Sequence, residues 1–442
     1  LYRSRTTDWN ARMITPSKAI RDSLDTCLRR RRATRVNRQL RVLAIQQKAR
    51  SSEGTVFSTL LSSMQDDPDS EQGVAFMVLQ FGHEGLIEGK KLGEIRGVKV
   101  VSIDIGGSIG IVQPSLRKAS SLARLFLSLP KLLAAPLLFR PDVVYSSQQA
   151  WDSLIAGTLS FLLGCPHVLH LHYVPGLGGP LIRNLSLRTQ ARSTNIIFVS
   201  DFLRRVASSR FYDAKVTVIR NVLAPKPIVP HVPVTQARNA LCEELAIPNS
   251  GVFVGMVARM NRWKGQLELL RAMAPLLAER QVTRRLFLVG SEDDPRAGYL
   301  NQLVRLAEQE GVRDRVHFLG QRSDVTRLLQ AFDVFAHPSF DDPCPIAVIE
   351  ALLAGLPTVV WRDGGAAELV VDGRSGYLIE TGNVESLSTA LGRLCDDAGL
   401  RDTMRSVALA DAPRLSDTRS AGGTFRSVLE GAVRSSERRP YP

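Results

Sequence analysis

Cysteine is scarce in this chain, and its few copies are scattered. The 442 residues contain an odd number of cysteines with no CxxC pair, namely Cys27, Cys165, Cys242, Cys344 and Cys395. This spacing argues against a structural zinc site and against a disulfide framework. It is typical of a reducing cytosol, so we expect a cytoplasmic location.

Long apolar runs are also missing. The nearest approach to a membrane-spanning segment is residues 122–139, where Arg124, Pro130, Lys131 and Pro136 interrupt the apolar side chains. We predict one or two helices that cover a sheet, with a surface resting on a membrane as the alternative. The N-terminal residues lack an apolar segment followed by a small-residue cleavage site, so no secretory signal is expected.

Acidic residues are too few to balance the basic ones, and the formal net charge is +14. Residues 1–41 contain twelve Lys and Arg against three Asp and Glu, an excess of nine, which leaves +5 for the other 401 residues. No aromatic residues interleave with the arginine run at residues 29–32, so we expect no specific nucleic-acid partner. Residues 1–38 are predicted to be a flexible tail, with peripheral contact to an anionic membrane as the alternative.

The rest of the chain alternates short apolar runs, most of them rich in β-branched residues, with helix-like segments. This rhythm predicts doubly wound α/β domains with parallel sheets. The predicted strands of a first sheet are 42–45, 74–79, 98–103, 142–145, 168–171, 196–199 and 216–219. Those of a second sheet are 252–258, 285–289, 316–318, 334–336, 358–360 and 376–379, with helical segments at 386–395 and 400–432 closing the chain.

A proline-rich segment separates the two predicted sheets. Pro225, Pro227, Pro230 and Pro233 lie too close together to continue a helix or a central strand. The predicted division is a tail (1–38), an N-terminal Rossmann-like domain (39–223), a linker (224–236), a C-terminal Rossmann-like domain (237–395), and closing helices with a tail (396–442). Ligands bind outside the carboxyl ends of the strands in such sheets, so we expect the active site in the cleft between the domains.

The first motif follows the first strand of the second sheet. It reads Ala-Arg-Met-Asn-Arg-Trp-Lys-Gly over residues 258–265, and a helix is expected to begin near Gly265. A helix N-terminus has a partial positive charge, so Arg259 and Lys264 are unfavourable beside it unless an anion lies between them. A pyrophosphate would supply that anion. The alternative is that both are solvated surface residues.

The second motif covers residues 338–355 and includes a predicted helix that starts at Pro345 and ends at Gly355. The free backbone N–H groups at its start, those of Ile346, Ala347 and Val348, would complete a phosphate cradle. Glu350 is a lone charge in this apolar helix, and a ribose diol would satisfy its carboxylate. The alternative for Glu350 is pairing with an arginine or with backbone.

Acidic residues precede this helix. Asp342 is placed to reach sugar hydroxyls, and the alternative is a turn or capping residue. Nothing near Asp341 and Asp342 supplies further ligands at metal-site spacing, so no metal is predicted.

The third motif, Gly364-Gly365-Ala366-Ala367-Glu368, follows the predicted strand 358–360. Its two glycines allow a sharp turn close to a ligand, and capping of a helix start is the simplest role for Glu368.

Together, these three segments resemble the retaining glycosyltransferases of family 4, which include bacterial mannosyl-, glucosyl- and N-acetylglucosaminyltransferases of surface polysaccharides. The resemblance covers about residues 250–395 and keeps the order and spacing of the motifs. It implies the GT-B fold, with two Rossmann-like doubly wound domains facing a central cleft. It also implies retaining transfer of a hexose or N-acetylhexosamine from a UDP- or GDP-linked donor, without another cofactor. The expected acceptor is a glycan, a lipid-linked molecule or a small molecule, in cell-surface polysaccharide synthesis.

The resemblance also implies roles for individual residues. Arg259 and Lys264 would bind the donor diphosphate and stabilise its departing charge. Glu350 would bind the ribose, and Leu319 would lie where the strand end meets the nucleobase through backbone. The loop 342–347 would hold the sugar and phosphates through Asp342, Pro345, Ile346 and Ala347. Asp342 stands where the family usually has the longer Glu, and Asp341 is an alternative for its role.

The N-terminal half carries weaker signals. The segment 51–55, with Gly54, is similar to the family's glycine-rich loop beside the donor, although it has a single glycine. Residues 140–145 look like the family's fourth strand, and the run 164–172 is similar to the strand that ends in a cleft-facing histidine. The resemblance implies that this residue is His172 and that it orients the sugar, whereas a structural or surface role is the alternative.

Other functions stay open at this point. A nucleotide-sugar epimerase on the same fold would consume its substrate without an acceptor, and a glycosyl phosphorylase would depend on inorganic phosphate. A non-catalytic scaffold would bind a nucleotide sugar without hydrolysing or transferring it.

Deletion of residues 1–37 separates the tail from the catalytic domains. We expect sugar transfer to survive while affinity for anionic vesicles falls, because the excess of basic residues lies in the removed segment. Vesicle co-sedimentation and a transfer assay on the same preparations measure the two properties. A loss of transfer on deletion would contradict the tail assignment.

Overall fold

The computed structural model describes residues 39–46, 52–65, 73–81, 92–103, 128, 130–147, 150–174, 180–211, 214–224, 234–279, 281–292 and 295–438. The predicted tail at 1–38 lies outside these ranges, as do residues 225–233 of the predicted linker.

The first sheet has seven parallel strands in the order β3-β2-β1-β4-β5-β6-β7. They are β1 (Arg41–Gln46), β2 (Ala75–Phe81), β3 (Val98–Ile103), β4 (Val143–Ser147), β5 (His167–Leu171), β6 (Asn195–Phe198) and β7 (Lys215–Val218). The helices between them are α2 (Ser52–Gln65), α5 (Ala150–Leu163), α6 (Pro180–Ala191) and α7 (Asp201–Ala207), and the short turn η1 (Ser208–Arg210) follows α7.

The second sheet has six parallel strands in the order β10-β9-β8-β11-β12-β13. They are β8 (Val252–Val257), β9 (Arg284–Val289), β10 (Val316–Gly320), β11 (Val334–His337), β12 (Thr358–Trp361) and β13 (Gly376–Ile379). The helices around it are α8 (Val234–Leu245), α9 (Gln266–Ala278), α10 (Tyr299–Gln309), α11 (Val325–Ala331), α12 (Ile346–Leu353) and α13 (Val384–Asp396). Helix α8 begins inside the range predicted as linker.

Both sheets match the predicted strands to within a few residues, which confirms the doubly wound α/β fold. The strands were predictable because most are buried on both faces and therefore read as continuous apolar runs. In each sheet the strand order reverses beside the first strand, with β1 between β2 and β4 and β8 between β9 and β11. Loops diverge at such a switch point and leave a crevice. The first two motifs follow β8 and β11, so the topology places them next to each other.

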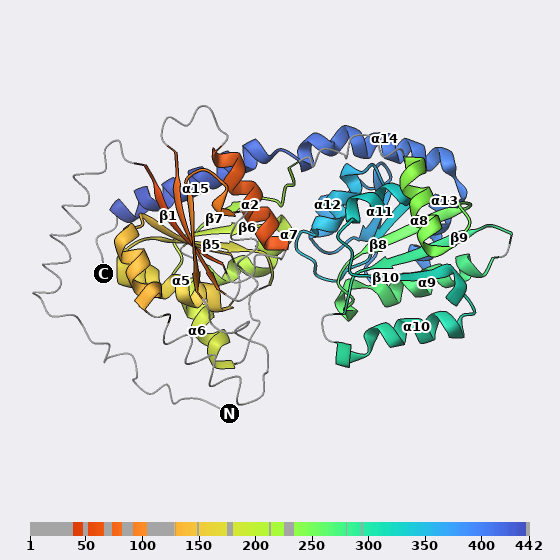
Figure 1. Ribbon diagram of the computed structural model, residues 1–442, viewed down its shortest axis with the longest axis horizontal. Helices are drawn as coiled ribbons and strands as arrows, with labels where there is room; N and C mark the ends of the chain where they lie inside the picture. The colour runs from red at the N-terminus through yellow and green to blue at the C-terminus, as the bar shows by residue number, and fades with distance from the viewer. Residues whose placement is uncertain are drawn as a thin grey trace, which may run out of the picture.

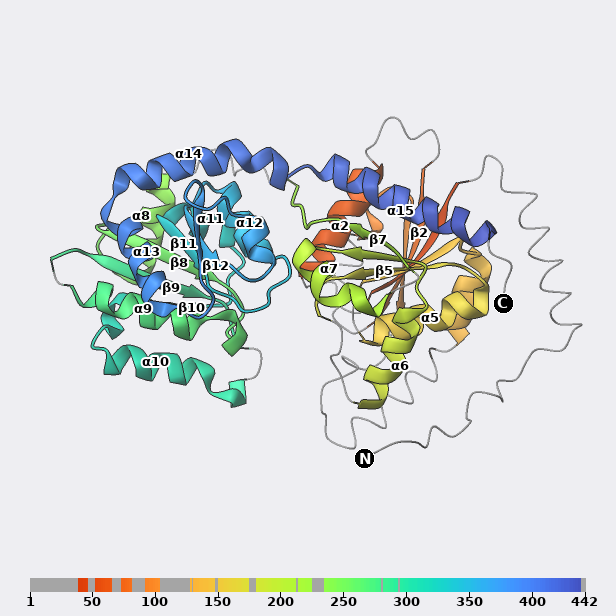
Figure 2. The ribbon, with the colours of Figure 1, turned by 180° about the vertical axis from the view of Figure 1, so that it is seen from behind.

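The closing helical stretch is the main departure from the prediction. Residues 400–432 are not one segment but belong to two helices, α14 (Ala398–Leu415) and α15 (Thr418–Arg438). Asp417 lies in the break, and its carboxylate accepts a hydrogen bond from the Ser420 N–H at 2.9 Å. Helix α14 packs on α12 and α13, whereas α15 packs on α2, β4 and β5. The two helices follow the same side of the molecule, α14 over the second unit and α15 over the first (Figures 1 and 2).

Helix α15 completes the core of the N-terminal unit. Phe425 and Leu429 are fully buried in one apolar cluster with Phe57 of α2 and Tyr145 of β4. The Phe425 ring meets the Tyr145 ring edge-on at 5.2 Å between centroids. The chain therefore returns to its first domain after completing the second.

Residues 130–139 are helical, as predicted for the end of the stretch 122–139. Leu132, Ala135 and Phe139 pack against the cluster formed by the first sheet and α5, whereas Leu137 and Leu138 are exposed. This part of the stretch covers the sheet, and residues 122–127 lie outside the described ranges. None of the helices in the described part of the chain is both long and apolar enough to cross a membrane.

Replacement of Leu429 by Ala tests the contribution of α15 to the first domain. We expect the free energy of unfolding to fall by about 2–5 kcal/mol, because a fully buried leucine leaves a cavity. Leu409→Ala on α14 is the matched control, since Leu409 is 46% exposed and its loss is expected to cost less than about 1 kcal/mol. Equal effects in urea-induced unfolding would contradict the packing of α15.

Candidate active site

The loops after β8 and β11 are bound to each other. Gly265, between η2 (Arg262–Lys264) and α9, has a φ of 81°, and a Cβ atom there would lie 1.8 Å from the Pro338 carbonyl oxygen. The Phe340 N–H donates to the Trp263 carbonyl oxygen at 2.8 Å. Only glycine allows this approach, so the first two motifs meet through their backbones.

The third motif also contacts the second through its backbone at a glycine. The Gly365 N–H donates to the Asp342 carbonyl oxygen at 2.8 Å, and a Cβ atom at Gly365 would lie 1.4 Å from the Pro343 carbonyl oxygen. Gly365 begins the short turn η5 (Gly365–Glu368). The three motifs are therefore one cluster in space.

An ion pair lies where the first two motifs meet. The ammonium nitrogen of Lys264 is 2.5 Å from Oδ2 of Asp342, and their side chains are only 13% and 8% exposed. The same nitrogen lies 3.9 Å from the centroid of the Trp263 ring, a cation–π contact. Loss of one member of such a buried pair typically costs about 3–5 kcal/mol, because the other charge is left uncompensated.

Asp342 receives further donors. His337 Nε2 lies 3.2 Å and Ser339 Oγ 3.3 Å from the same Oδ2. Burial acts to raise the pKa of Asp342, but the charge of Lys264 and the contacts with His337 outweigh it, so the pKa lies well below its ordinary value. Asp342 is therefore a carboxylate at neutral pH. Asp341, the alternative from sequence, is exposed and has a φ of 51°.

Arg259 lies beyond the end of β8 and is exposed. Its carbonyl oxygen accepts a hydrogen bond from Gln266 Nε2 at 2.9 Å, which joins the end of the strand to the first turn of α9. The structure thus brings Lys264 and Asp342 into direct contact and places Arg259 on the loop that leads to them.

The start of α12 differs in one detail from the expectation. Pro345 is the N-cap residue, and the Val348 N–H donates back to its carbonyl oxygen at 3.2 Å. Val348 is thus not available to a ligand, whereas no acceptor among the described residues takes the N–H groups of Ile346 and Ala347. Glu350, one turn further, is half-buried.

This helix start faces the other domain. The Ile346 side chain packs against apolar clusters of both domains. Just before it, the Cys344 carbonyl oxygen accepts a hydrogen bond from Asn221 Nδ2 at 2.8 Å. The open N–H groups of α12 therefore lie at the boundary between the two sheets, where the cleft was expected.

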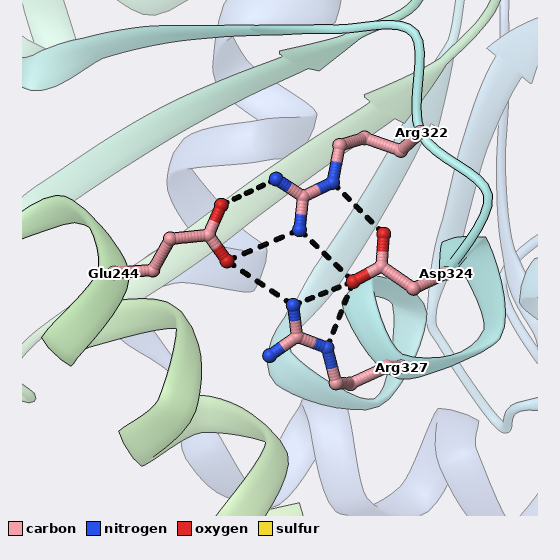
Figure 3. A network of polar contacts seen from close by, with 4 residues as sticks. All are labelled: Glu244, Arg322, Asp324 and Arg327. Atoms are coloured by element: carbon pink, nitrogen blue, oxygen red, sulfur yellow. Dashed lines mark hydrogen bonds and ion pairs between the residues drawn. The ribbon is translucent and has the colours of Figure 1, made fainter.

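Leu319 lies in an irregular part of its strand. Along β10, Phe318 pairs with Leu288 and Gly320 pairs with Val289, so the register with β9 skips Leu319. Immediately beyond the strand, Arg322, Asp324 and Arg327 form an ion-pair network with Glu244 of α8 (Figure 3). The hydrogen bond from Arg322 is the largest effect on Asp324 and holds its pKa well below the ordinary value. The network binds the loop after Leu319 to α8.

The N-terminal candidates lie on the other sheet. Gly54 is in the first turn of α2. His172 follows β5 directly, is 6% exposed, and has no hydrogen-bond partner for Nε2 among the described residues. Its ring lies 4.2 Å from that of His170, and burial lowers the pKa of His172 to about 3. His172 is therefore a buried neutral imidazole rather than a surface residue, and among the described residues no hydrogen bond joins it to Lys264 or Asp342.

Glu368 caps a helix, as its position suggested, but the helix belongs to the other domain. Its carboxylate accepts the N–H groups of Asp201 at 3.1 Å and Phe202 at 2.5 Å, at the start of α7. Arg220, beyond β7, donates to Glu368 at 3.0 Å and to Asp201 at 2.7 Å. We name these four residues the interdomain contact.

Several contributors to the site were not assigned a role from sequence. They are Trp263, His337, Ser339, Asn221 and Arg220. His337 was detectable in principle, since a polar residue ending a buried strand shortly before Asp342 is positioned to meet it. The partners of Asn221 and Arg220 lie in the other domain, and no local pattern identifies them. Within the described residues, no group of three or more His, Cys, Asp and Glu could hold a metal ion.

Models of known families match both halves of the chain. Residues 238–409 match the family model for glycosyl transferases group 1, and residues 71–225 match the model for glycosyltransferase family 4. The first match spans the second sheet and all three motifs, and the second spans β2–β7 of the first sheet but not β1.

Individual relatives match over part of their length. A D-inositol 3-phosphate glycosyltransferase of Corynebacterium jeikeium is 32% identical over 236 residues, 52% of this chain and 56% of that protein. The lipopolysaccharide glucosyltransferase WaaG of Escherichia coli is 34% identical over 139 residues, 31% of this chain and 36% of that protein. The chain thus spans about half the length, or less, of these curated relatives.

Solved structures share the fold. The Anabaena protein HepE, in complex with UDP and glucose, superposes with a TM-score of 0.71 at 22% identity, covering 89% of this chain and all of HepE (100%). This likeness concerns the fold, and it confirms the GT-B arrangement predicted from the sequence.

Replacement of Glu368 by Ala tests the interdomain contact. We expect unfolding stability to fall by about 1–2 kcal/mol, because two N–H groups at the start of α7 lose their acceptor. The interdomain distances measured by small-angle X-ray scattering should also broaden. Glu385→Ala, at an exposed position in the first turn of α13, is the control and should change neither property. Unaltered scattering and stability in Glu368→Ala would contradict the role of this contact.

Proposed function

We propose that this chain, which belongs to the group 1 glycosyltransferases of family 4, transfers a sugar from a nucleotide-diphosphate donor to an acceptor. The observation that carries the proposal is the buried Lys264–Asp342 pair at the point where the three motifs meet. The donor sugar is a hexose or an N-acetylhexosamine, and transfer retains its anomeric configuration. The acceptor is a glycan, a lipid-linked molecule or a small molecule, as expected in cell-surface polysaccharide synthesis.

The diphosphate is assigned to the positive end of this cluster. An ammonium group has three hydrogens, and Asp342 needs one of them, so two remain for phosphate oxygens. The N–H groups of Ile346 and Ala347 support the same site, because open N–H groups at a helix start attract anions. Arg259 adds a second cation on the adjoining loop. These groups would stabilise the charge that develops on the departing diphosphate.

The remaining contacts with the donor are assigned to residues of both domains. Glu350 is placed on the ribose, and the skipped position of Leu319 supports contact between its backbone and the base of a UDP- or GDP-linked donor. Asp342 and Pro345 line the sugar side of the loop. His172 and Gly54 contribute from the N-terminal domain, where a neutral His172 would exchange hydrogen bonds with a sugar hydroxyl rather than transfer a proton near pH 7.

We also propose that the protein is cytoplasmic. The four cysteines in the described part of the chain are buried, and none of them is in a disulfide. Such thiols suit a reducing compartment.

Replacement of Lys264 by Met tests the diphosphate site. We expect turnover to fall by about 100-fold or more, because a charge that stabilises the leaving group is lost. Thermal stabilisation by UDP or GDP, whichever stabilises the wild-type protein, should weaken in parallel because ligand binding raises stability by mass action. Circular dichroism checks that the variant is folded.

Arg262→Met is the matched control. Arg262 is exposed in the same short turn and donates to Gln302, so its loss should leave donor turnover within about threefold. Turnover by Lys264→Met at the wild-type rate, in a panel of UDP- and GDP-sugars, would refute the proposed function.

A further inference from the structure

His337 is the last residue of β11 and contacts Asp342, the residue proposed to bind the donor sugar. Its side chain is 1% exposed, and Nε2 lies 3.2 Å from Oδ2 of Asp342. The ring is nearly parallel to that of Phe335, with 6.2 Å between centroids. Among the described residues, Nδ1 is buried and has no hydrogen-bond partner.

These contacts decide which ring nitrogen of His337 carries hydrogen. Asp342 is ionised and can only accept, so Nε2 must be the donor. Burial and, to a smaller extent, the charge of Lys264 lower the pKa of His337, and together they exceed the opposing contribution of Asp342. The imidazole is therefore neutral, with its hydrogen on Nε2 and none on Nδ1.

Of the three donors to Asp342 among the described residues, His337 is the one that is not divided between Asp342 and a second acceptor. The Ser339 hydroxyl has one hydrogen, but it lies 3.3 Å from both the Trp263 carbonyl oxygen and Asp342 Oδ2. Lys264 would also donate hydrogen bonds to a bound diphosphate. The Nε2 hydrogen of His337 has no other acceptor among the described residues.

All three donors reach the same carboxylate oxygen. Lys264, His337 and Ser339 converge on Oδ2, and no donor among the described residues reaches Oδ1. A carboxylate held by one oxygen presents the other in a fixed direction. In Asp342 this second oxygen is Oδ1, and a hydroxyl group of a sugar would donate a hydrogen bond to it.

We propose that His337 is a positioning residue, whose Nε2 hydrogen bond orients Asp342 so that Oδ1 accepts a hydroxyl of the donor sugar. This inference rests on the proposed function and adds a residue to its site. It also gives a reason for the short side chain at 342. A glutamate would carry its carboxylate one methylene further from the backbone, away from the hydrogen bond that His337 offers.

Two substitutions of His337 separate its hydrogen bond from its shape. His337→Phe keeps an aromatic ring beside Phe335 and removes the donor, whereas His337→Gln keeps an amide N–H at about the reach of Nε2. The probes are the nucleotide sugar that the wild-type protein turns over fastest in a panel of UDP- and GDP-sugars, and the matching free nucleoside diphosphate.

We expect His337→Phe to lower kcat/KM for the nucleotide sugar by about 10- to 100-fold, the usual effect of losing a hydrogen bond to a charged group. Its Kd for the free diphosphate should stay within about twofold of wild type, because that ligand lacks the sugar. His337→Gln should recover most of the loss. If the Phe variant does not fold, His337→Asn replaces it, since its amide is too short to reach Asp342.

A double-mutant cycle with Asp342→Asn completes the test. If His337 acts through Asp342, His337→Phe should add little loss in the Asp342→Asn background. Losses that multiply, an equal loss of affinity for the free diphosphate, or wild-type kcat/KM in His337→Phe would each overturn the inference while the proposed function stands. A wild-type protein that neither binds nor turns over any donor in the panel refutes the proposed function and the inference with it.

Discussion

A buried pair of opposite charges, Lys264 and Asp342, sets the requirements for the rest of the site. The two residues are 78 positions apart in the chain, and the charge of each offsets much of the cost of burying the other. The two loops that carry them must therefore be held close together, with little conformational freedom. Gly265 and Gly365 allow the backbones to touch, and the switch point between β8 and β11 brings the loops to the same crevice. A diphosphate would enter a site whose charges are already arranged, which is the condition for electrostatic catalysis.

The segments that build this site also join the two domains. The second motif meets Asn221 through the Cys344 carbonyl oxygen, and the third motif ends in Glu368, which caps α7 of the first domain. Helix α15 then returns to the first domain and fills its core. Donor contacts and the placement of the domains thus depend on the same short loops. A change in the angle between the domains would therefore alter the positions of the residues that are proposed to bind the donor.

Much of the fold was predictable because its signals are local. Most strands of a parallel sheet lie between helices and are buried, so β8, for example, appears in the sequence as a run without a polar side chain. The limits of α12 followed from Pro345 and Gly355 for a similar reason. The break between α14 and α15 was missed, although Pro413 in the last turn of α14 and Asp417, which caps the Ser420 N–H, give a local signal for it. The break lets the two helices pack on different domains.

The sequence alone determined the alternation of strands and helices, the order of the motifs, and the kinds of side chain available for phosphate and sugar. Only the tertiary structure decided which partner each side chain takes. Lys264 pairs with Asp342 rather than Asp341, Glu368 caps a helix of the other domain, and His337 becomes a donor to Asp342. The physical reason is that hydrogen bonds and ion pairs act over a few ångströms. Strand order and domain contacts, which no local pattern records, decide which distant residues come within that range.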